Sequence, residues 1–367
     1  MNSMLPKINI KYDLLLFTPI LIMGLLGIMT VYSATGSIDV AKSHFNRFIF
    51  GFIMMLIITQ IRPDFIQSFV SKYAYIINVL LLFAVIAFGT TAMGATRWLN
   101  LGFITFQPSE LVKVTLPLYL SYLIYVKEKP KSPKEIIICG LIIMIPALLV
   151  VVQPDLGTSV IIMLSGIVVL FQAGLSIPFI FIVIAMLSTM FPLFWSLLMD
   201  YQKQRVLTMF NPEFDSLGSG YHIIQSKIAI GNGGVFGTGF LSGTQTQLNF
   251  IPEQHTDFIF SAFAEEYGFM GFLIIMFLYA FIILRVFSII KQLSNNYQKL
   301  VCGSFLFIFS SYIFINLGMI SGILPVVGVP LPFFSYGGTY MIIQMISFGI
   351  VASFYVHNYK GSKNKYK

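Results

Sequence analysis

The chain has 367 residues, of which 57% are hydrophobic and only 10% are charged, and its mean hydropathy is +0.86. Soluble domains carry about 25% charged residues, so this composition excludes a soluble globular protein and indicates an integral membrane protein. The formal net charge of +8 is not gathered into a basic patch interleaved with aromatic residues, so it indicates attraction to anionic membrane lipid and not nucleic-acid binding.

Ten apolar runs are long enough to cross a membrane as helices, which takes about 20 residues each. The first is too long for a signal-peptide core and is expected to be retained as a span. The sequence therefore predicts an all-α polytopic membrane protein, with one domain over residues 1–367. In chain order the runs cover residues 14–33, 45–61, 74–93, 108–126, 135–152, 158–171, 177–198, 258–284, 300–321 and 338–357.

The lysine and arginine residues predict on which side of the membrane each loop lies. Fifteen of them lie in the two terminal segments and in the loops after even-numbered runs, whereas six lie on the other side. The positive-inside rule then places both termini in the cytoplasm. The long loop between the seventh and eighth runs, at residues 199–257, would lie outside the cell, and its length predicts structure or function of its own.

Within that loop, Tyr221, Ile224 and Ile228 recur at helical spacing, which predicts a short helix in the membrane interface. The glycines that follow, in residues 231–233, are expected to end it. The glycine-rich stretch at residues 231–239 lacks the spacing and the preceding strand of a dinucleotide fingerprint, and is expected to let the loop pack closely against the membrane surface. The four histidines are dispersed and have no cysteine partners nearby, so they predict no zinc site.

Several acidic residues and one lysine lie where charge is costly. Glu110 and Lys113 share one helix face at the outer start of the fourth run, which suggests a function, although simple mutual neutralisation is the alternative. Asp257, where the eighth run begins, could be a general base or could cap the helix. Glu265 and Glu266 lie about two turns deeper and could form a second acidic layer or could face a neighbouring helix.

The remaining candidates are external polar residues. Arg97, Arg205 and Lys227, with helix N-termini, could hold a phosphate or diphosphate, although each alone could be a solvated charge. Asp155 lies in a tight turn, where an Asx-turn is the default role. A divalent cation, Mg²⁺ or Mn²⁺, could bridge carboxylates to a diphosphate, but the sequence does not require one. Outside the cell a lipid diphosphate fits as donor, because it carries its own leaving group.

Six stretches resemble the SEDS family (shape, elongation, division and sporulation), in the family's order and over nearly the whole chain. They are residues 94–99, 107–110 with Lys113, 153–158, 221–226, 252–258 and 331–338. Residues 243–247 resemble the elongation-type (RodA) branch more than the division-type (FtsW) branch. Gln254, where elongation-type members often have arginine, is a mild departure.

The resemblance implies a ten-helix peptidoglycan glycosyltransferase of the bacterial cytoplasmic (inner) membrane, whose active site faces the periplasm or cell exterior. It would polymerise lipid II, release undecaprenyl diphosphate, and work with a class B penicillin-binding transpeptidase and the rod-shape elongation complex. It further implies that Asp257 deprotonates the acceptor sugar 4-hydroxyl, giving a β-1,4 link with inversion, and that Glu110 and Lys113 form a functional pair. The expected substrate-binding residues are Arg97, Trp98, Glu110, Lys113, Asp155, Arg205, Lys227, Gln245, His255 and Ser335.

Three other interpretations stay open. A lipid II flippase would use the same substrate, but it would need a polar path that reaches the cytoplasmic face, whereas most charges here lie near the outer boundary. A division-type polymerase would share the chemistry. A noncatalytic scaffold for the transpeptidase would leave Asp257 only its capping role.

Overall fold

The computed structural model describes residues 12–92, 95–100, 102, 105–126, 132–175, 189, 195–196, 199–211, 218–248, 250 and 255–364. Within these residues, nine long helices carry the fold. They are α1 (Leu14–Thr35), α2 (Ile38–Thr59), α4 (Ser71–Phe88), α5 (Pro108–Val126), α6 (Pro133–Val152), α7 (Leu156–Gln172), α13 (Ile259–Gln292), α14 (Asn296–Ile320) and α15 (Thr339–Asn364). Shorter helical elements are α3 (Pro63–Phe65), a π-turn at Ile66–Val70, α10 (Asp200–Phe210), α11 (Ser219–Gly233) and α12 (Thr244–Gln247).

The nine long helices confirm nine of the ten predicted apolar runs. Among the described residues, seven helices are long and apolar enough to cross a membrane, namely α1, α2, α3 with α4, α6, α13, α14 and α15. In addition, α7 is a shorter apolar helix, and α5 coincides with the fourth run and contains the two charged side chains Glu110 and Lys113. The seventh run, at 177–198, lies outside the described residues except for 189, 195 and 196.

The helix starts show how local sequence sets the boundaries. Ser132 and Glu135 form a capping box at the start of α6, in which each side chain accepts a hydrogen bond from the other residue's backbone N–H. The Asp155 carboxylate accepts a hydrogen bond of 3.1 Å from the Thr158 N–H at the start of α7. Helix α2 begins at Ile38, seven residues before the predicted run, because polar residues at its start lower hydropathy without interrupting the helix.

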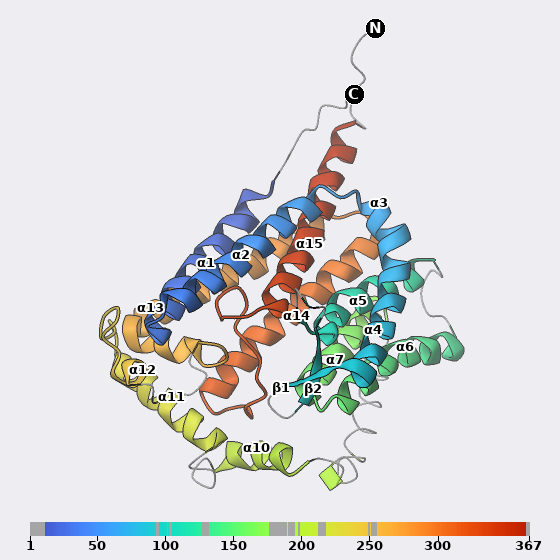
Figure 1. Cartoon of the computed structure of the whole chain (residues 1–367). Coiled ribbons are helices and arrows are strands. Elements are labelled where there is room, and N and C mark those ends of the chain that lie inside the picture. Colours follow the sequence, from blue (N-terminus) through green and yellow to red (C-terminus); the bar gives the residue numbers. More distant parts are fainter. Residues whose placement is uncertain are drawn as a thin grey trace.

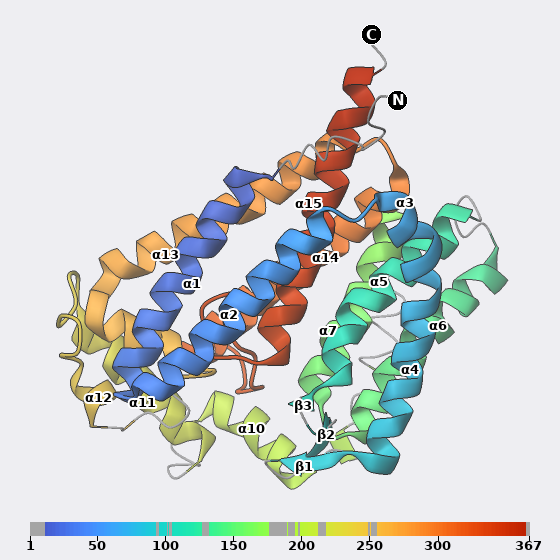
Figure 2. The ribbon, with the colours of Figure 1, turned by 45° about the horizontal axis from the view of Figure 1, so that its top comes forward.

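Two apolar clusters form the interior. Helices α1, α2, α13, α14 and α15 supply most of the first cluster, and α4, α5, α6 and α7 supply most of the second. Helix α5 joins them, because Val114 and Leu118 lie in the first cluster while Leu116 and Leu120 lie in the second. The two groups of helices are visible side by side in Figure 2. Many large apolar side chains on the outer faces of α1, α4, α6 and α13 are exposed, as expected for surfaces that face lipid.

The two ends of the molecule differ. The start of α1 and the end of α15 lie together at one end, and the short strands, α10 and α11 lie at the opposite end (Figure 1). We call this opposite end, formed by the strands, α10, α11, α12 and residues 321–338, the loop end. Its three-stranded antiparallel sheet consists of β1 (Thr90–Ala92), β2 (Ala95–Asn100) and β3 (Thr105–Phe106). These strands were not predicted: residues 90–92 were assigned to the end of the third apolar run and residues 94–107 to a loop, because strands of two to six residues leave too short an alternation to recognise.

The predicted helix in the long loop is confirmed as α11, which ends at Gly233 as expected. The face that packs against the protein carries Ile223, Ser226 and Ala229, all buried, whereas Ile228 is exposed. The apolar repeat of Tyr221, Ile224 and Ile228 therefore did not identify the packed face, because α11 rests on α13 through small side chains. Helices α10 and α12, which lie in the same loop, were not predicted.

The glycine-rich stretch packs closely, as expected, and its partner in the structure is the backbone of α13. Helix α13 is interrupted at Gly268, which has φ +62°, a conformation that glycine adopts readily. At this break the Phe269 and Met270 N–H groups donate to the Gly234 and Val235 carbonyls, at 2.9 and 3.0 Å. The loop thus supplies acceptors for N–H groups freed by the break in α13.

Candidate functional site

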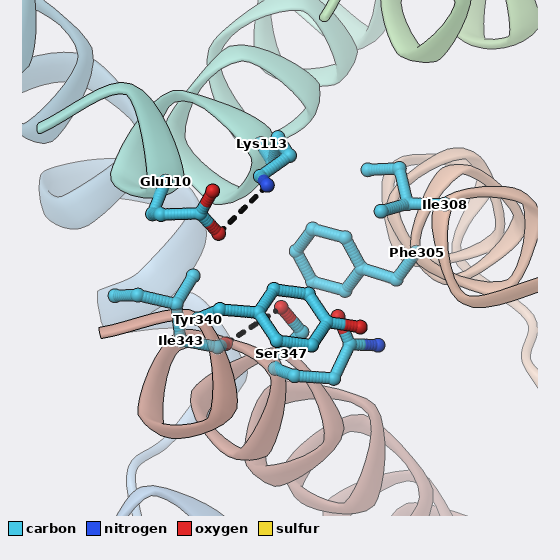
Figure 3. Close-up of a pocket in the computed structure, with 8 residues that line it drawn as sticks. Glu110, Lys113, Phe305, Ile308, Tyr340, Ile343 and Ser347 are labelled. Carbon is cyan, nitrogen blue, oxygen red and sulfur yellow. Dashed lines mark hydrogen bonds and ion pairs between the residues drawn. The ribbon is translucent and has the colours of Figure 1, made fainter. Parts of the chain in front are cut away.

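Glu110 and Lys113 form a buried ion pair on α5. Lys113 Nζ lies 2.7 Å from Glu110 Oε2, and the two side chains are 4% and 8% exposed respectively. Their spacing of three residues brings them onto one face of the helix, as predicted. Figure 3 shows both side chains projecting from α5 into the space between α14 and α15. A pair at this depth is costly to desolvate, so its retention requires further polar or aromatic contacts.

Two tyrosines supply those contacts. Lys113 Nζ donates a hydrogen bond to the Tyr312 hydroxyl and lies 4.6 Å and 5.4 Å from the ring centroids of Tyr312 and Tyr340. The two rings are stacked, with centroids 4.5 Å apart. Aromatic faces stabilise a desolvated ammonium group. Glu110 and the aromatic pair from α14 and α15 therefore stabilise the charge of Lys113 together.

A small cavity continues from this pair toward α15 (Figure 3). Its volume for the centre of a water molecule is about 10 Å³, close to the minimum for one water. Beside Glu110, Lys113 and Tyr340, it is lined by Gln344 and Ser347, both almost fully buried. The polar lining that begins at Lys113 therefore continues along α15 to Gln344 and Ser347.

A second polar group lies between the sheet and α7. Arg97, on β2, donates hydrogen bonds to the Gln153 carbonyl (3.3 Å) and the Pro154 carbonyl, and its Nε lies 3.8 Å from Asp155 Oδ2. Gln107 Nε2 donates to the same carboxylate at 3.1 Å. Asp155 thus combines the expected turn role with an ion pair.

Asp257 lies in the turn that leads into α13. Its carbonyl accepts a hydrogen bond of 2.8 Å from Asn316 Nδ2, which also donates to the Val329 carbonyl at 2.7 Å. Its carboxylate faces Gly328, where a Cβ atom would lie only 3.3 Å from Oδ2. Helix α13 begins at Ile259 and has Phe258 at the N-cap position, so Asp257 does not occupy that position.

The segment at residues 331–338 connects Asp257 with the ion pair. The Tyr336 N–H donates to the His255 carbonyl at 3.0 Å, and the rings of these residues lie 5.4 Å apart. Ser335 Oγ accepts a hydrogen bond of 2.7 Å from the Leu331 N–H, which makes Ser335 part of the turn. Four residues after Tyr336, Tyr340 reaches Lys113.

Helix α14 makes a second connection between the same two places. Tyr312, which contacts Lys113, and Asn316, which holds the Asp257 backbone, are four residues apart and so lie on one face of α14. The Asp257 turn and the intramembrane pair are therefore about one helical turn apart along α14. The structure brings together Asp257, His255, Glu110 and Lys113 around α14 and residues 331–340.

Of the two alternatives for Glu265 and Glu266, the structure favours contact with neighbouring helices over a shared acidic layer. The Glu265 carboxylate accepts hydrogen bonds from the backbone N–H groups of Gln245 (2.8 Å) and Thr246 (3.0 Å) and from the hydroxyls of Thr244 and Thr246. The Glu266 carboxylate accepts one from the Ser33 hydroxyl on α1. Glu265 thus fixes α12, including the backbone of the predicted binding residue Gln245, and Glu266 ties α13 to α1.

The other predicted binding residues lie apart from this centre. Trp98 is in β2, where its carbonyl accepts a hydrogen bond from the Thr90 hydroxyl. Arg205, on α10, lies 5.7 Å from the Tyr201 ring centroid. Lys227 is exposed on α11, and its ammonium approaches Gly322 at the end of α14. The Tyr201 hydroxyl donates to the Pro154 carbonyl, which also accepts from Arg97, so Arg97 and Arg205 are linked through Tyr201.

Several residues of the site were not predicted from the sequence. Tyr312, Tyr340 and Asn316 come from helices with no local signal that separates them from ordinary apolar or capping residues. Arg47, on α2, was counted only as a charge on one side of the membrane. In the part of the chain that the structure describes, no group of three or more His, Cys, Asp or Glu side chains is placed to hold a metal ion.

The Asp257 carboxylate, which faces Gly328, can take a proton from one substrate. The buried Lys113 ammonium and the half-buried Arg97 guanidinium can stabilise an anion on another.

A family model described as a cell cycle protein, named for FtsW, RodA and SpoVE, matches residues 10–360. The peptidoglycan glycosyltransferase MrdB of Escherichia coli (strain K12) is 45% identical over 338 residues, covering 92% of this chain and 91% of that protein. The peptidoglycan glycosyltransferase RodA of Treponema pallidum (strain Nichols) is 30% identical, covering 93% of this chain and 97% of that one.

Solved structures are similar over almost the whole chain. One, from work on the structural coordination of polymerization and crosslinking by a peptidoglycan synthase complex, gives a TM-score of 0.83 at 26% identity, covering 95% of this chain and 99% of that chain. The rod shape determining protein RodA of Thermus thermophilus gives a TM-score of 0.74 at 23% identity, covering 96% and 99%. The arrangement of helices described above is thus shared with these proteins.

Proposed function

Because this chain belongs to the FtsW/RodA/SpoVE family, also called SEDS, we propose that it is an elongation-type peptidoglycan glycosyltransferase that polymerises lipid II, with Asp257 as its general base. The similarity to the MrdB and RodA glycosyltransferases supports the reaction. The single observation that supports the site is the position of Asp257, in a turn tied by Asn316 to the same face of α14 that carries the Lys113 partner Tyr312.

The reaction needs one base and a stabilised leaving group. The Asp257 carboxylate takes the proton of the 4-hydroxyl of the acceptor sugar, and the resulting oxygen attacks the anomeric carbon of the donor. The bond between that carbon and the diphosphate oxygen breaks, and the diphosphate leaves with the electron pair. A diphosphate is a stable anion, so it needs cations and hydrogen-bond donors and not a second acid, in contrast to glycoside hydrolysis.

Glu110 and Lys113 would shape the substrate side of this centre. Lys113 is held by Glu110, Tyr312 and Tyr340, so its ammonium group has a fixed position in a water-poor site. A fixed cation in such surroundings stabilises nearby negative charge more strongly than a mobile one in water. Arg97 and Asp155 would order the neighbouring turn, since the hydrogen bonds of Arg97 to the Gln153 and Pro154 carbonyls and its ion pair with Asp155 hold β2 against the start of α7.

We also propose an orientation of the protein in the membrane. The loop end would face the periplasm or cell exterior, and both termini would lie in the cytoplasm, as the distribution of lysine and arginine predicts. The common location of the start of α1 and the end of α15 is compatible with this topology. We further propose a class B penicillin-binding transpeptidase, within the rod-shape elongation complex, as the partner, because a similar structure comes from a peptidoglycan synthase complex.

The test is polymerisation in liposomes that contain lipid II and a transpeptidase whose own catalytic serine has been removed. The wild type is expected to build glycan strands, and Asp257→Asn is expected to build none while it still folds and binds its partner. The matched control is Asp39→Asn, which changes an exposed carboxylate at the start of α2. Full polymerisation by Asp257→Asn would refute the assignment of the base, and lipid II translocation without polymerisation by the wild type would instead favour a flippase.

A further inference from the structure

Arg47 is a charged side chain within a membrane-spanning helix that the proposed chemistry has not yet used. It lies nine residues after the first residue of α2, well inside a span, where a guanidinium is costly and suggests a function. Its guanidinium carbon lies 4.8 Å from the ring centroid of Tyr336. Its Nη1 would be 3.9 Å from a Cβ atom added at Gly338. Arg47 therefore faces the same segment that carries Tyr336 beside His255 and Asp257.

Two other cations near this centre, Arg97 and Lys113, each have a carboxylate partner. Arg97 is paired with Asp155 at 3.8 Å, and Lys113 is paired with Glu110 at 2.7 Å. Arg47 has no carboxylate partner among the residues that the structure describes, only the face of the Tyr336 ring. A half-buried guanidinium with an aromatic neighbour and no counter-ion is suited to an anionic ligand, above all to the paired oxygens of a phosphate.

His44 provides an independent second observation. It lies one turn before Arg47 on α2 and is fully buried, with 0% exposed. Its ring lies 5.7 Å from the same Tyr336 ring, and both of its ring nitrogens lack a hydrogen-bond partner within the described chain. Buried polar groups nearly always have partners, so an unpartnered imidazole beside an unpaired guanidinium indicates a ligand that supplies the missing contacts.

We propose that Arg47, together with His44, binds the diphosphate of the donor lipid as it leaves; this rests on the proposed function. The donor diphosphate departs from the carbon that is attacked, so it must lie close to the base and the acceptor hydroxyl. The diphosphate of the acceptor is separated from its reacting hydroxyl by sugar residues. A guanidinium one aromatic ring away from the Asp257 turn is therefore placed for the donor and not for the acceptor.

The ligand is tested first without turnover, by the binding of undecaprenyl diphosphate to the purified wild type and to variants in nanodiscs. Arg47→Gln is expected to weaken binding by about 10-fold or more, the loss typical of a hydrogen bond to a charged group. Arg47→Lys keeps the charge and is expected to lose less. Lys42→Gln, an exposed cation five residues earlier on the same helix, is the matched control and is expected to change binding less than 2-fold.

A lipid II analogue whose 4-hydroxyl is blocked can serve only as donor. It tests whether Arg47 binds the diphosphate of the donor or that of the acceptor. Arg47→Gln should raise the KM for this analogue; a rise in the KM for the acceptor alone would overturn the donor assignment. If the affinity for undecaprenyl diphosphate is the same in Arg47→Gln, Arg47→Lys and the wild type, and only the thermal midpoint falls, then Arg47 merely supports Tyr336 and the inference is wrong. A wild type that binds the diphosphate through Arg47 but does not polymerise would count against the proposed function alone.

Discussion

Replacing Glu110 with glutamine tests whether the buried pair on α5 is an interacting pair of charges. The change removes the only carboxylate within ion-pair distance of Lys113 in the described chain. Breaking a buried pair by removing one partner typically costs about 3–5 kcal/mol. Here the ammonium keeps the Tyr312 hydroxyl and two aromatic faces, and the glutamine oxygen can still accept a weaker hydrogen bond. We therefore expect the free energy of unfolding to fall by about 2–3 kcal/mol, at or below the lower end of that range.

The assay is a double-mutant cycle on purified protein in detergent, with Glu110→Gln, Lys113→Met and the two combined. Because the combined variant leaves no unpaired charge, it should be more stable than the sum of the single losses predicts, by about 2 kcal/mol. A coupling energy near zero would refute the argument that the two charges are desolvated together. Polymerisation is measured in parallel: a combined variant that recovers both stability and activity would show that the pair has only a structural role.

Three further predictions concern glycines and one carboxylate. Gly328→Ala should destabilise the fold by about 1–2 kcal/mol, since φ at this position is +72°. It should also reduce polymerisation, because the new methyl group meets the Asp257 carboxylate. The control Gly102→Ala, at φ +87° with open space around it, should lose stability but not polymerisation. Gly237→Ala would place a methyl group against the α13 backbone and should lower the thermal midpoint by more than Gly102→Ala. Glu265→Gln should cost about 1–3 kcal/mol, because at least one backbone N–H of α12 loses its acceptor, and protease cleavage within α12 should become faster.

The long helices and the ion pair could be predicted from the sequence because both are set by local spacing. An apolar run of about 20 residues identifies a span, and a separation of three residues identifies the shared face of Glu110 and Lys113. The break in α13 could not be predicted, because Gly268 lies in an apolar run that reads as continuous. The break depends on hydrogen bonds between α13 and residues 234–239, which no local pattern reveals.

The surroundings of the site were hidden for a related reason. Tyr312 and Tyr340 follow Lys113 by about 200 residues in the chain and lie in helices with many other aromatic residues, so only packing identifies them. Arg47 contributed to the topology rule as one charge among six, and the rule uses only the side on which a charge lies. Its contact with Tyr336 comes from the packing of α2 against the chain just before α15, which spacing along the sequence cannot predict.

Helix α5 is packed on both sides, because alternate residues belong to two different apolar clusters. Adding one residue inside a helix turns everything beyond it by about 100°, so an insertion after Lys113 would move Leu118 out of register with the first cluster and Leu116 and Leu120 out of register with the second. An insertion in the chain just before Pro108 would leave that packing intact. Length variation among natural and engineered versions of this protein should therefore accumulate before the helix and be rejected within it.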